Sequence, residues 1–254
     1  MEIIRTIRLS AAQLTAVSEL IGCCRLADHT DFTYPAEDPA CHYLLLSGSG
    51  RLESVFIALD AIEPETLEGL AFTRPEVRKQ GFFRLLLDAL TEDFPETDLI
   101  FPVDHHAAAA LSVMAALDAD CLSTEHRMEL SLSASDLCET ESETEAETLM
   151  LFESLPEEDG EAAWTLYAGS TGVRLGSCRL TYYNTAACLH HVEIQPDYRR
   201  RGYAVRMLSS LCPQLRIKGL DQLFLHVSAD NRPALALYQK TGFRITKTLS
   251  YYLF

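Results

Sequence analysis

The chain has 254 residues, of which 48% are hydrophobic, and this composition supports a folded core rather than a disordered chain. Its net charge of −16 excludes general nucleic-acid binding, which needs a basic surface to neutralise phosphates. No apolar run reaches the ~18 residues that a membrane span requires, and the N-terminus lacks the basic and apolar regions of a secretion signal.

The eight cysteines are scattered along the chain, and only Cys23 and Cys24 are adjacent. No Cys-x-x-Cys motif and no Cys/His spacing typical of a metal site occurs in the sequence. This pattern predicts reduced thiols in a cytoplasmic protein, with neither a metal site nor a disulfide framework.

The first half of the chain alternates strand-like and helix-like segments. Ser10 is expected to cap a helix over residues 10–21, whose apolar residues recur on one helical face. The remaining predictions are strands at 1–7, 43–47, 53–59, 66–72, 98–104 and 126–132, and a helix at 107–117.

One pattern occurs twice in the sequence. Residues 73–88 contain a proline, an acid, an apolar residue, a basic turn, a glycine and an apolar helix, and residues from Pro196 onward repeat this plan. Gly81 in the first copy corresponds to Gly202 in the second. The chain therefore reads as two copies of one α/β unit.

An acidic segment separates the two copies. Residues 129–161 contain 12 acidic residues and no Lys or Arg, and most of the part before residue 149 has no core-forming pattern. We expect a first domain over residues 1–135, a linker over 136–148 and a second domain over 149–254.

The second copy is organised around the stretch from Leu189 to Leu211. Residues 189–194 read as a strand, Pro196 and Asp197 end it, and a basic turn then leads into an apolar helix. A strand, a turn and a helix N-terminus in this order form an anion site, because unpaired amides and the helix dipole point at the ligand. The strands before this stretch are expected at 162–168 and 172–183.

Two further segments follow, a strand at 223–228 and a capped helix that ends at Gly242. Together with the Arg199-x-x-Gly202-x-Ala204 turn, these segments resemble the GNAT superfamily of acyl-CoA N-acyltransferases. The resemblance covers about 65 residues and rests also on Asn231, Ala234, Tyr238 and Gly242-Phe243 in the expected order. Family members usually carry a second glycine where this chain has Ala204.

The resemblance implies two tandem GNAT-like domains of the α/β class, each a mostly antiparallel twisted sheet flanked by helices. The first copy looks degenerate, because Phe83 stands where the second copy has Ala204, and its ring would crowd a phosphate. A structural or substrate-facing role is expected for it.

The resemblance also implies transfer of an acetyl group from acetyl-CoA to an amine in a ternary complex. It assigns the oxyanion to the backbone amide of Val192 or Ile194, and proton donation to the departing thiolate to Tyr238. The residues that it implies for the cofactor are Val192, Ile194, Arg199, Arg200, Arg201, Gly202, Tyr203, Ala204 and Asn231.

Three residues are candidates for the general base. Glu193 and His190 lie on the central strand, and His226 lies on the next strand, five residues before Asn231. A histidine has an unperturbed pKa suited to base work near neutrality, whereas a glutamate needs a raised pKa or a water relay. We rank Glu193 slightly above His226 and both above His190.

The leading hypothesis is an N-acyltransferase, and the alternative is a non-catalytic protein that senses acyl-CoA. The acceptor is expected to be a small-molecule amine or a protein or peptide amine, with oligomerisation possible and with no nucleic-acid or membrane partner. The acidic balance favours a cationic amine.

Overall fold

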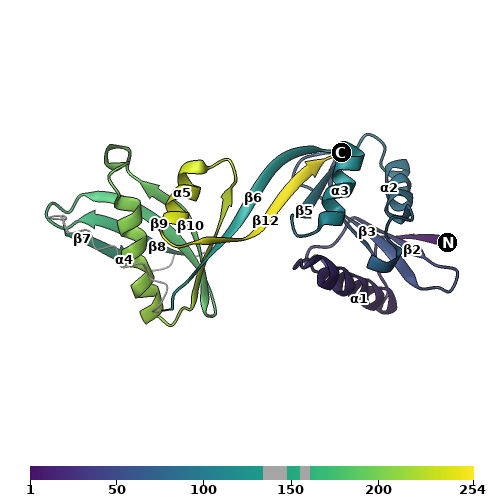
Figure 1. Ribbon diagram of the computed structural model, residues 1–254, viewed down its shortest axis with the longest axis horizontal. Helices are drawn as coiled ribbons and strands as arrows, with labels where there is room; N and C mark the ends of the chain where they lie inside the picture. The colour runs from purple at the N-terminus through teal and green to yellow at the C-terminus, as the bar shows by residue number, and fades with distance from the viewer. Residues whose placement is uncertain (134–147, 155–160) are drawn as a thin grey trace. The chain divides into compact units, whose positions relative to one another are not determined.

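The computed structural model describes residues 1–133, 148–154 and 161–254 (Figure 1). The chain forms two compact units. Unit 1 contains Met1–Thr124 and Thr248–Phe254, and unit 2 contains Glu125–Lys247. Each unit has a mixed, mostly antiparallel sheet with helices, which confirms the predicted α/β class.

In unit 1 the strands lie in the order β1-β2-β3-β4-β5-β12, and only β4 and β5 are parallel. Ser10 caps the first helix, as predicted, and its side chain and that of Gln13 form a capping box. The helix runs seven residues past the predicted end at Ile21 and stops at His29, which adopts a left-handed conformation. The elements are β1 (Glu2–Thr6), α1 (Ala11–Asp28), β2 (Cys41–Leu46), β3 (Leu52–Asp60), β4 (Thr66–Thr73), a 3-10 turn (Pro75–Val77), α2 (Phe82–Asp93), β5 (Asp98–Asp104), α3 (Ala108–Leu117) and β6 (Asp120–Ser131).

Helices cover both faces of the unit 1 sheet. Side chains of a strand alternate between faces, so neighbouring residues of β3 belong to different cores. Val55 and Ile57 pack with α1, whereas Phe56 and Ala58 pack with α2. The first copy is therefore a three-layer structure with α1 and α2 on opposite faces (Figure 1).

In unit 2 the strands lie in the order β6-β11-β10-β9-β8-β7, and only β10 and β11 are parallel. The elements are β7 (Leu149–Glu153), β8 (Glu161–Ala168), β9 (Arg174–Tyr183), β10 (Ala186–Ile194), a 3-10 turn (Pro196–Tyr198), α4 (Tyr203–Ile217), β11 (Gln222–Ser228), α5 (Arg232–Lys240) and β12 (Arg244–Leu253).

The unit 2 sheet has one helix-covered face. Apolar residues of α4 and α5 pack in a single core cluster with alternate residues of the strands, among them Trp164, Leu180 and Leu189. Among the residues that the structure describes in this unit, no helix equivalent to α1 covers the opposite face. We call this opposite side the open face.

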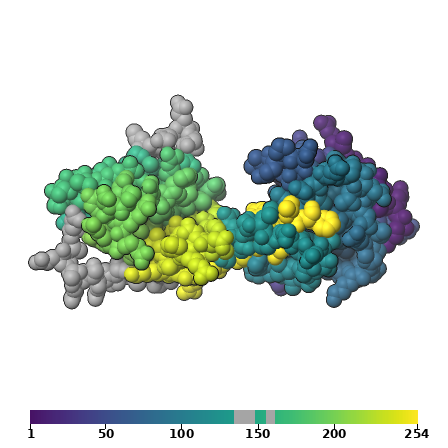
Figure 2. Space-filling model, turned by 90° about the horizontal axis from the view of Figure 1, so that it is seen from above, coloured from purple at the N-terminus to yellow at the C-terminus, as the bar shows by residue number. Residues whose placement is uncertain are grey.

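The last strand of each sheet comes from the other copy of the repeat. Residues Glu125–Ser131 of β6 pair antiparallel with β11 in unit 2, and Leu249–Leu253 of β12 pair antiparallel with β5 in unit 1. In Figures 1 and 2 the yellow C-terminal strand lies beside teal residues of unit 1.

This exchange differs from the expected division at residues 135 and 149. Residues 125–131 pair within unit 2 rather than within the first domain, and residues 248–254 complete unit 1. The physical reason is that β5 and β11 each need an antiparallel neighbour, and either copy's last strand satisfies that need. The predicted linker, residues 136–148, lies outside the described residues except for Thr148.

A substitution in the C-terminal strand tests this exchange. The Ser250 hydroxyl is 1% exposed and lies 2.8 Å from His105 Nε2 and 2.7 Å from Thr124 Oγ1, all within unit 1. Ser250→Ala removes both hydrogen bonds from partners that water can still reach, which costs about 0.5–1.5 kcal/mol for each bond. We expect faster hydrogen exchange at β5 amides and little change at β10. Thr246→Ala, an exposed change on the same strand, serves as the control, and equal exchange in the two variants contradicts the assignment.

Candidate functional site

The central opening of unit 2 lies between β10 and β11. These strands pair in parallel over Ala186–Cys188 and Gln222–Phe224. The residues of β10 beyond Cys188 still pair with β9 on the other side. A parallel pair that stops in this way leaves the β10 edge available to an extended ligand, which can add to it as a further strand would.

A bulge in β10 lies beside this opening. His190 pairs with Arg179 and Glu193 pairs with Ser177, so two residues of β10 stand against one residue of β9. The first of the two, His191, has a left-handed conformation with φ of 51°. A bulge re-aims the backbone locally and is enriched next to active sites.

Gly176 allows the two strands to approach closely just after the bulge. It pairs with Ile194, and a Cβ added at residue 176 would lie 2.4 Å from the Glu193 carbonyl oxygen and 2.5 Å from Ile194 Cδ1. Both distances are far below contact distance, so only glycine fits here without displacing β10.

The basic turn after β10 has the geometry of an anion site. Arg199 is extended, Arg200 has φ of 63°, and Gly202 has φ of 81° at the N-terminus of α4. The first amides of α4, including those of Tyr203 and Ala204, have no partner within the helix. A Cβ at Gly202 would meet nothing within 4 Å, so the space in front of these amides is open.

Four arginines surround this turn. The Arg199 Nε donates to the Ile194 carbonyl oxygen at 2.9 Å, and its Nη2 lies 3.9 Å from Glu193 Oε1. Arg201 lies over the Tyr198 ring at 5.7 Å and Arg206 over the Tyr203 ring at 5.8 Å. Arg200 is exposed. The turn therefore combines helix amides with guanidinium groups, the donors that bind phosphate oxygens best.

Unit 1 contains the same turn with its arginine engaged. Lys79 and Gly81 have φ of 63° and 82°, which match the second copy within one degree. Arg78 donates to the Thr73 carbonyl oxygen as Arg199 does to that of Ile194, but its two Nη atoms also bind Asp28 of α1 at 2.7 Å each. This bidentate pair occupies the donors that an incoming phosphate would need.

Unit 1 also lacks the bulge. Seven consecutive residues of β4, from Leu67 to Thr73, pair with β3 without a register shift. Thirteen positions separate the last parallel pair of β4, at Glu68, from Gly81, whereas fourteen separate Cys188 from Gly202. The extra residue is the bulge. Sequence reasoning missed it, although this difference in spacing was a signal that could have found it.

The three candidate bases lie on the open face. Leu189, Val192 and Ile194 point into the core, so His190 and Glu193 point away from it. On β11, Leu225 and Val227 are buried in the same core, and His226 between them is directed to the open face.

Each candidate base has an ionisable neighbour. Glu193 faces Arg199, and His226 Nδ1 lies 3.8 Å from Glu125 Oε2. His190 Nε2 lies 3.1 Å from Thr181 Oγ1, and its Nδ1 lies 2.8 Å from the Nδ1 of His191. One ring of this histidine pair must donate while the other accepts.

Tyr238 lies on the opposite side of the sheet from these bases. It is 8% exposed, belongs to the core cluster and packs edge-on against Phe243 with ring centroids 5.6 Å apart. Burial raises the pKa of its phenol, and the nearby Cys178 thiol adds to the effect. The hydroxyl therefore stays protonated near neutral pH.

Asn231 begins α5. Its side-chain oxygen accepts from the Ala234 amide at 3.2 Å and so caps the helix. Because the oxygen is engaged, a cofactor contact would involve the side-chain amino group.

No group of three or more His, Cys, Asp or Glu side chains in the described part of the chain is arranged to hold a metal ion. None of its helices combines the length and apolar character needed to cross a bilayer.

The C-terminal half of the chain is similar to known acetyltransferases. Residues 128–243 match the profile of the acetyltransferase (GNAT) family. A ribosomal protein bS18-alanine N-acetyltransferase from Salmonella typhimurium is 39% identical over 57 residues, which are 22% of this chain and 38% of that protein. Residues 128–243 of the chain are therefore similar to the GNAT acetyltransferase family.

Solved structures of this superfamily extend the likeness to the whole chain. A GCN5-related N-acetyltransferase from Sphaerobacter thermophilus matches with a TM-score of 0.71 and 14% identity, covering 99% of this chain and 95% of that one. A tandem GNAT protein from the clavulanic acid biosynthesis pathway matches with a TM-score of 0.58 and 14% identity, covering 100% and 98%. These matches confirm the GNAT fold, and the second has the tandem form predicted from the repeat.

The close approach at Gly176 yields a prediction. Gly176→Ala places a methyl group against the Glu193 carbonyl, and such overpacking costs about 1–3 kcal/mol. Urea unfolding should show this loss, and NMR should show displaced amide signals at Glu193 and Ile194. Gly48→Ala, which adds its methyl group to open space, should leave both measurements nearly unchanged. Equal behaviour of the two variants contradicts the close packing.

Proposed function

We propose that unit 2 is an N-acetyltransferase that moves an acetyl group from acetyl-CoA to a primary amine by direct attack in a ternary complex. The observation that carries this proposal is the one-residue bulge of β10 beside an accessible arginine turn. Unit 1 repeats the turn but has neither the bulge nor an unengaged Arg78.

The residues of unit 2 fit acetyl-CoA as a substrate. The pyrophosphate would rest on the amides from Arg199 to Ala204, where Gly202 leaves the approach open, and the arginines would add positive charge. The pantetheine amides would pair with the β10 edge at Val192 to Ile194. Asn231 would contribute its amino group.

The reaction forms one carbon–nitrogen bond and breaks one carbon–sulfur bond. The attacking amine loses a proton to a base, and the departing thiolate gains one from an acid. In our assignment a backbone amide at Val192 or Ile194, re-aimed by the bulge, donates to the carbonyl oxygen as negative charge develops. Tyr238 supplies the proton to sulfur.

For the base we keep the order Glu193, His226, His190. Glu193 directly follows the bulge, and its side chain is 60% exposed and reaches the open face. The His226 side chain is 48% exposed, and its Nδ1 lies 3.8 Å from Glu125 Oε2. His190 is the most enclosed of the three, at 23% exposed.

The acceptor would approach from the open face, where the candidate bases lie. On this face Arg127 pairs with Glu129 and Arg179 with Glu161, whereas Glu125 lies 3.8 Å from His226, so Glu125 is the carboxylate that would favour a cationic amine beside this candidate base. The bS18-alanine acetyltransferase acts on a protein, and we propose a protein or small-molecule amine here. The seven free cysteines of the described residues fit a reducing cytoplasm.

An acetyl-CoA turnover screen against an amine panel tests the function. Small polyamines, amino acids, aminoglycosides and alanine-terminated peptides are offered in turn, and free thiol is measured. At least one amine should release thiol well above the hydrolytic background. Tight CoA binding without release for any amine contradicts the transferase and points to an acyl-CoA sensor.

Tyr238→Phe tests the acid assignment. The variant keeps the ring in the core and removes only the hydroxyl, so stability and acetyl-CoA affinity should change little. Loss of the acid should lower kcat by roughly 10²- to 10⁴-fold.

The raised pKa of Tyr238 predicts the pH dependence of the parent protein. Because the phenol stays protonated, kcat should not fall through loss of the Tyr238 proton below about pH 10.

Tyr167→Phe, a change at a half-buried tyrosine in the same unit, is the control and should stay within a few-fold of the parent kcat. If Tyr238→Phe also turns over at the parent rate, another group protonates the thiolate.

A further inference from the structure

A large cavity lies in unit 1, where β4 and β5 separate. The two strands pair in parallel from Thr66 to Glu68 and from Asp98 to Ile100, and the cavity of about 710 Å³ lies beyond this pairing. It is bounded by α3, by the start of α2 and by the end of α1. Its volume is within the ~300–1,000 Å³ of small-molecule sites. It occupies the place in the first copy that the proposed cofactor opening has in the second.

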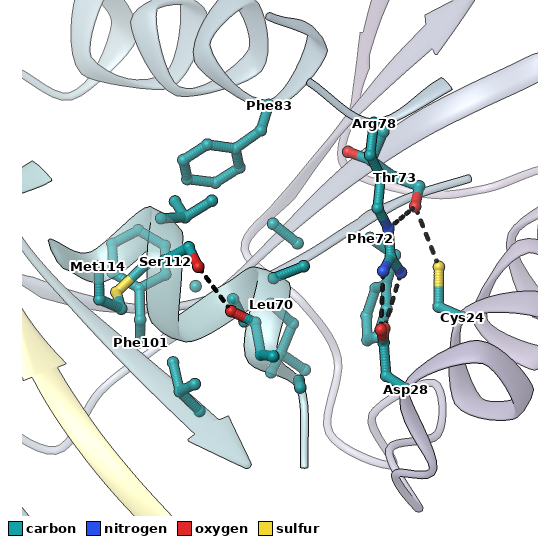
Figure 3. A pocket seen from close by; sticks show the side chains of 18 of the residues that line it. Cys24, Asp28, Leu70, Phe72, Thr73, Arg78, Phe83, Phe101, Ser112 and Met114 are labelled. Carbon is teal, nitrogen blue, oxygen red and sulfur yellow. Dashed lines mark hydrogen bonds and ion pairs between the residues drawn. The ribbon is translucent and has the colours of Figure 1, made fainter. Parts of the chain in front are cut away.

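The interior walls of this cavity are apolar. Phe83 of α2, Phe101 of β5 and Met114 of α3 stand around one end (Figure 3). The Phe83 and Phe101 rings lie edge to face at 6.2 Å, and Phe56 packs against both rings. The α3 wall consists mainly of small residues, among them Ala107 and Ala110. Such a wall favours a molecule with a flat apolar ring.

The charged groups at the cavity are mostly engaged with one another. Arg78 and Asp28 form their bidentate pair at the other end (Figure 3), with side chains 24% and 17% exposed. Arg84 pairs with Asp88 at 2.7 Å. Asp104, 2% exposed, accepts from the His106 amide and lies 2.9 Å from its Nδ1. Lys79 is exposed at the rim. A buried ionised ligand group would therefore lack a strong partner.

We propose that this cavity binds an uncharged apolar small molecule that contains an aromatic ring. Both copies of the repeat have an opening where two parallel strands separate, but the walls in unit 1 do not suit a phosphorylated ligand. Phe83 stands at the position of Ala204, and Asp28 forms a bidentate ion pair with Arg78. The ring of the ligand lies against Phe83 and Phe101, with Met114 and the alanines of α3 enclosing it. The site is separate from the proposed transferase site of unit 2.

Two matched fluorophores test the class of ligand on the full chain. N-phenyl-1-naphthylamine is neutral, and 8-anilino-1-naphthalenesulfonate carries the same ring system with a sulfonate. The neutral probe should bind at one site per chain, at least about tenfold more tightly than the anionic probe, a difference of ~1.4 kcal/mol. A saturating excess of acetyl-CoA should not displace it. Equal or tighter binding of the sulfonate, or displacement by acetyl-CoA, overturns the proposal.

Variants of α3 then place the probe. Ala110→Trp fills the cavity from its wall and should weaken binding of the neutral probe at least about tenfold, whereas Ala115→Trp, on the same helix and outside the cavity, should not. Ala109→Trp is a second filling variant at an exposed lining position, for use if Ala110→Trp does not fold. The assignment to this cavity is overturned if a folded filling variant binds the neutral probe as tightly as the parent does. It is also overturned if Ala115→Trp weakens binding of the probe as much as the filling variants do.

Discussion

The separation of two parallel strands is the constraint on which the rest of unit 2 depends. β10 and β11 pair over three residues and then part, so the chain has an unpaired strand edge where a ligand can make main-chain hydrogen bonds. The bulge and the arginine turn lie within the fourteen residues that follow Cys188, and Gly176 of β9 pairs with one of these residues, Ile194. The candidate bases lie on the open face of this sheet, and Tyr238 lies in the core on its other side.

The two units have the same backbone turn before a helix but differ in the side chains around it. The turn before α2 and the turn before α4 agree in φ within one degree at corresponding positions. In unit 1 helix α1 brings Asp28 to the turn arginine. In the described part of unit 2 no such helix is present, and the carboxylate nearest to Arg199 is that of Glu193, at 3.9 Å. The helix that completes the first core therefore also engages its turn arginine, and no described helix of unit 2 does the same for Arg199.

Much of the fold could be predicted from local sequence patterns. The alternation in β8 and the apolar face of α4 are set by residues near one another in the chain, and β7 starts at Leu149, the first residue expected for the second domain. The strand exchange could not be predicted, because periodicity identifies a strand but not its partner. No strand was assigned to residues 244–254, although β12 there contains the β-branched and aromatic residues typical of a strand.

For the site, the turn and its glycine were found from motif spacing, but the bulge required comparison of spacing between copies. The clash at Gly176 depends on the distance between two strands, which the sequence does not contain.

Titration calorimetry with acetyl-CoA tests the central claim, that the opening of unit 2 and not its counterpart in unit 1 holds the cofactor. The account predicts one site per chain. Gly202→Glu should abolish binding, since it places bulk and negative charge in front of the α4 amides, and Gly81→Glu should leave binding unchanged. The two glycines have the same left-handed φ and open surroundings, so both variants carry the same backbone strain. Two sites per chain, or binding lost in Gly81→Glu and kept in Gly202→Glu, would contradict the account.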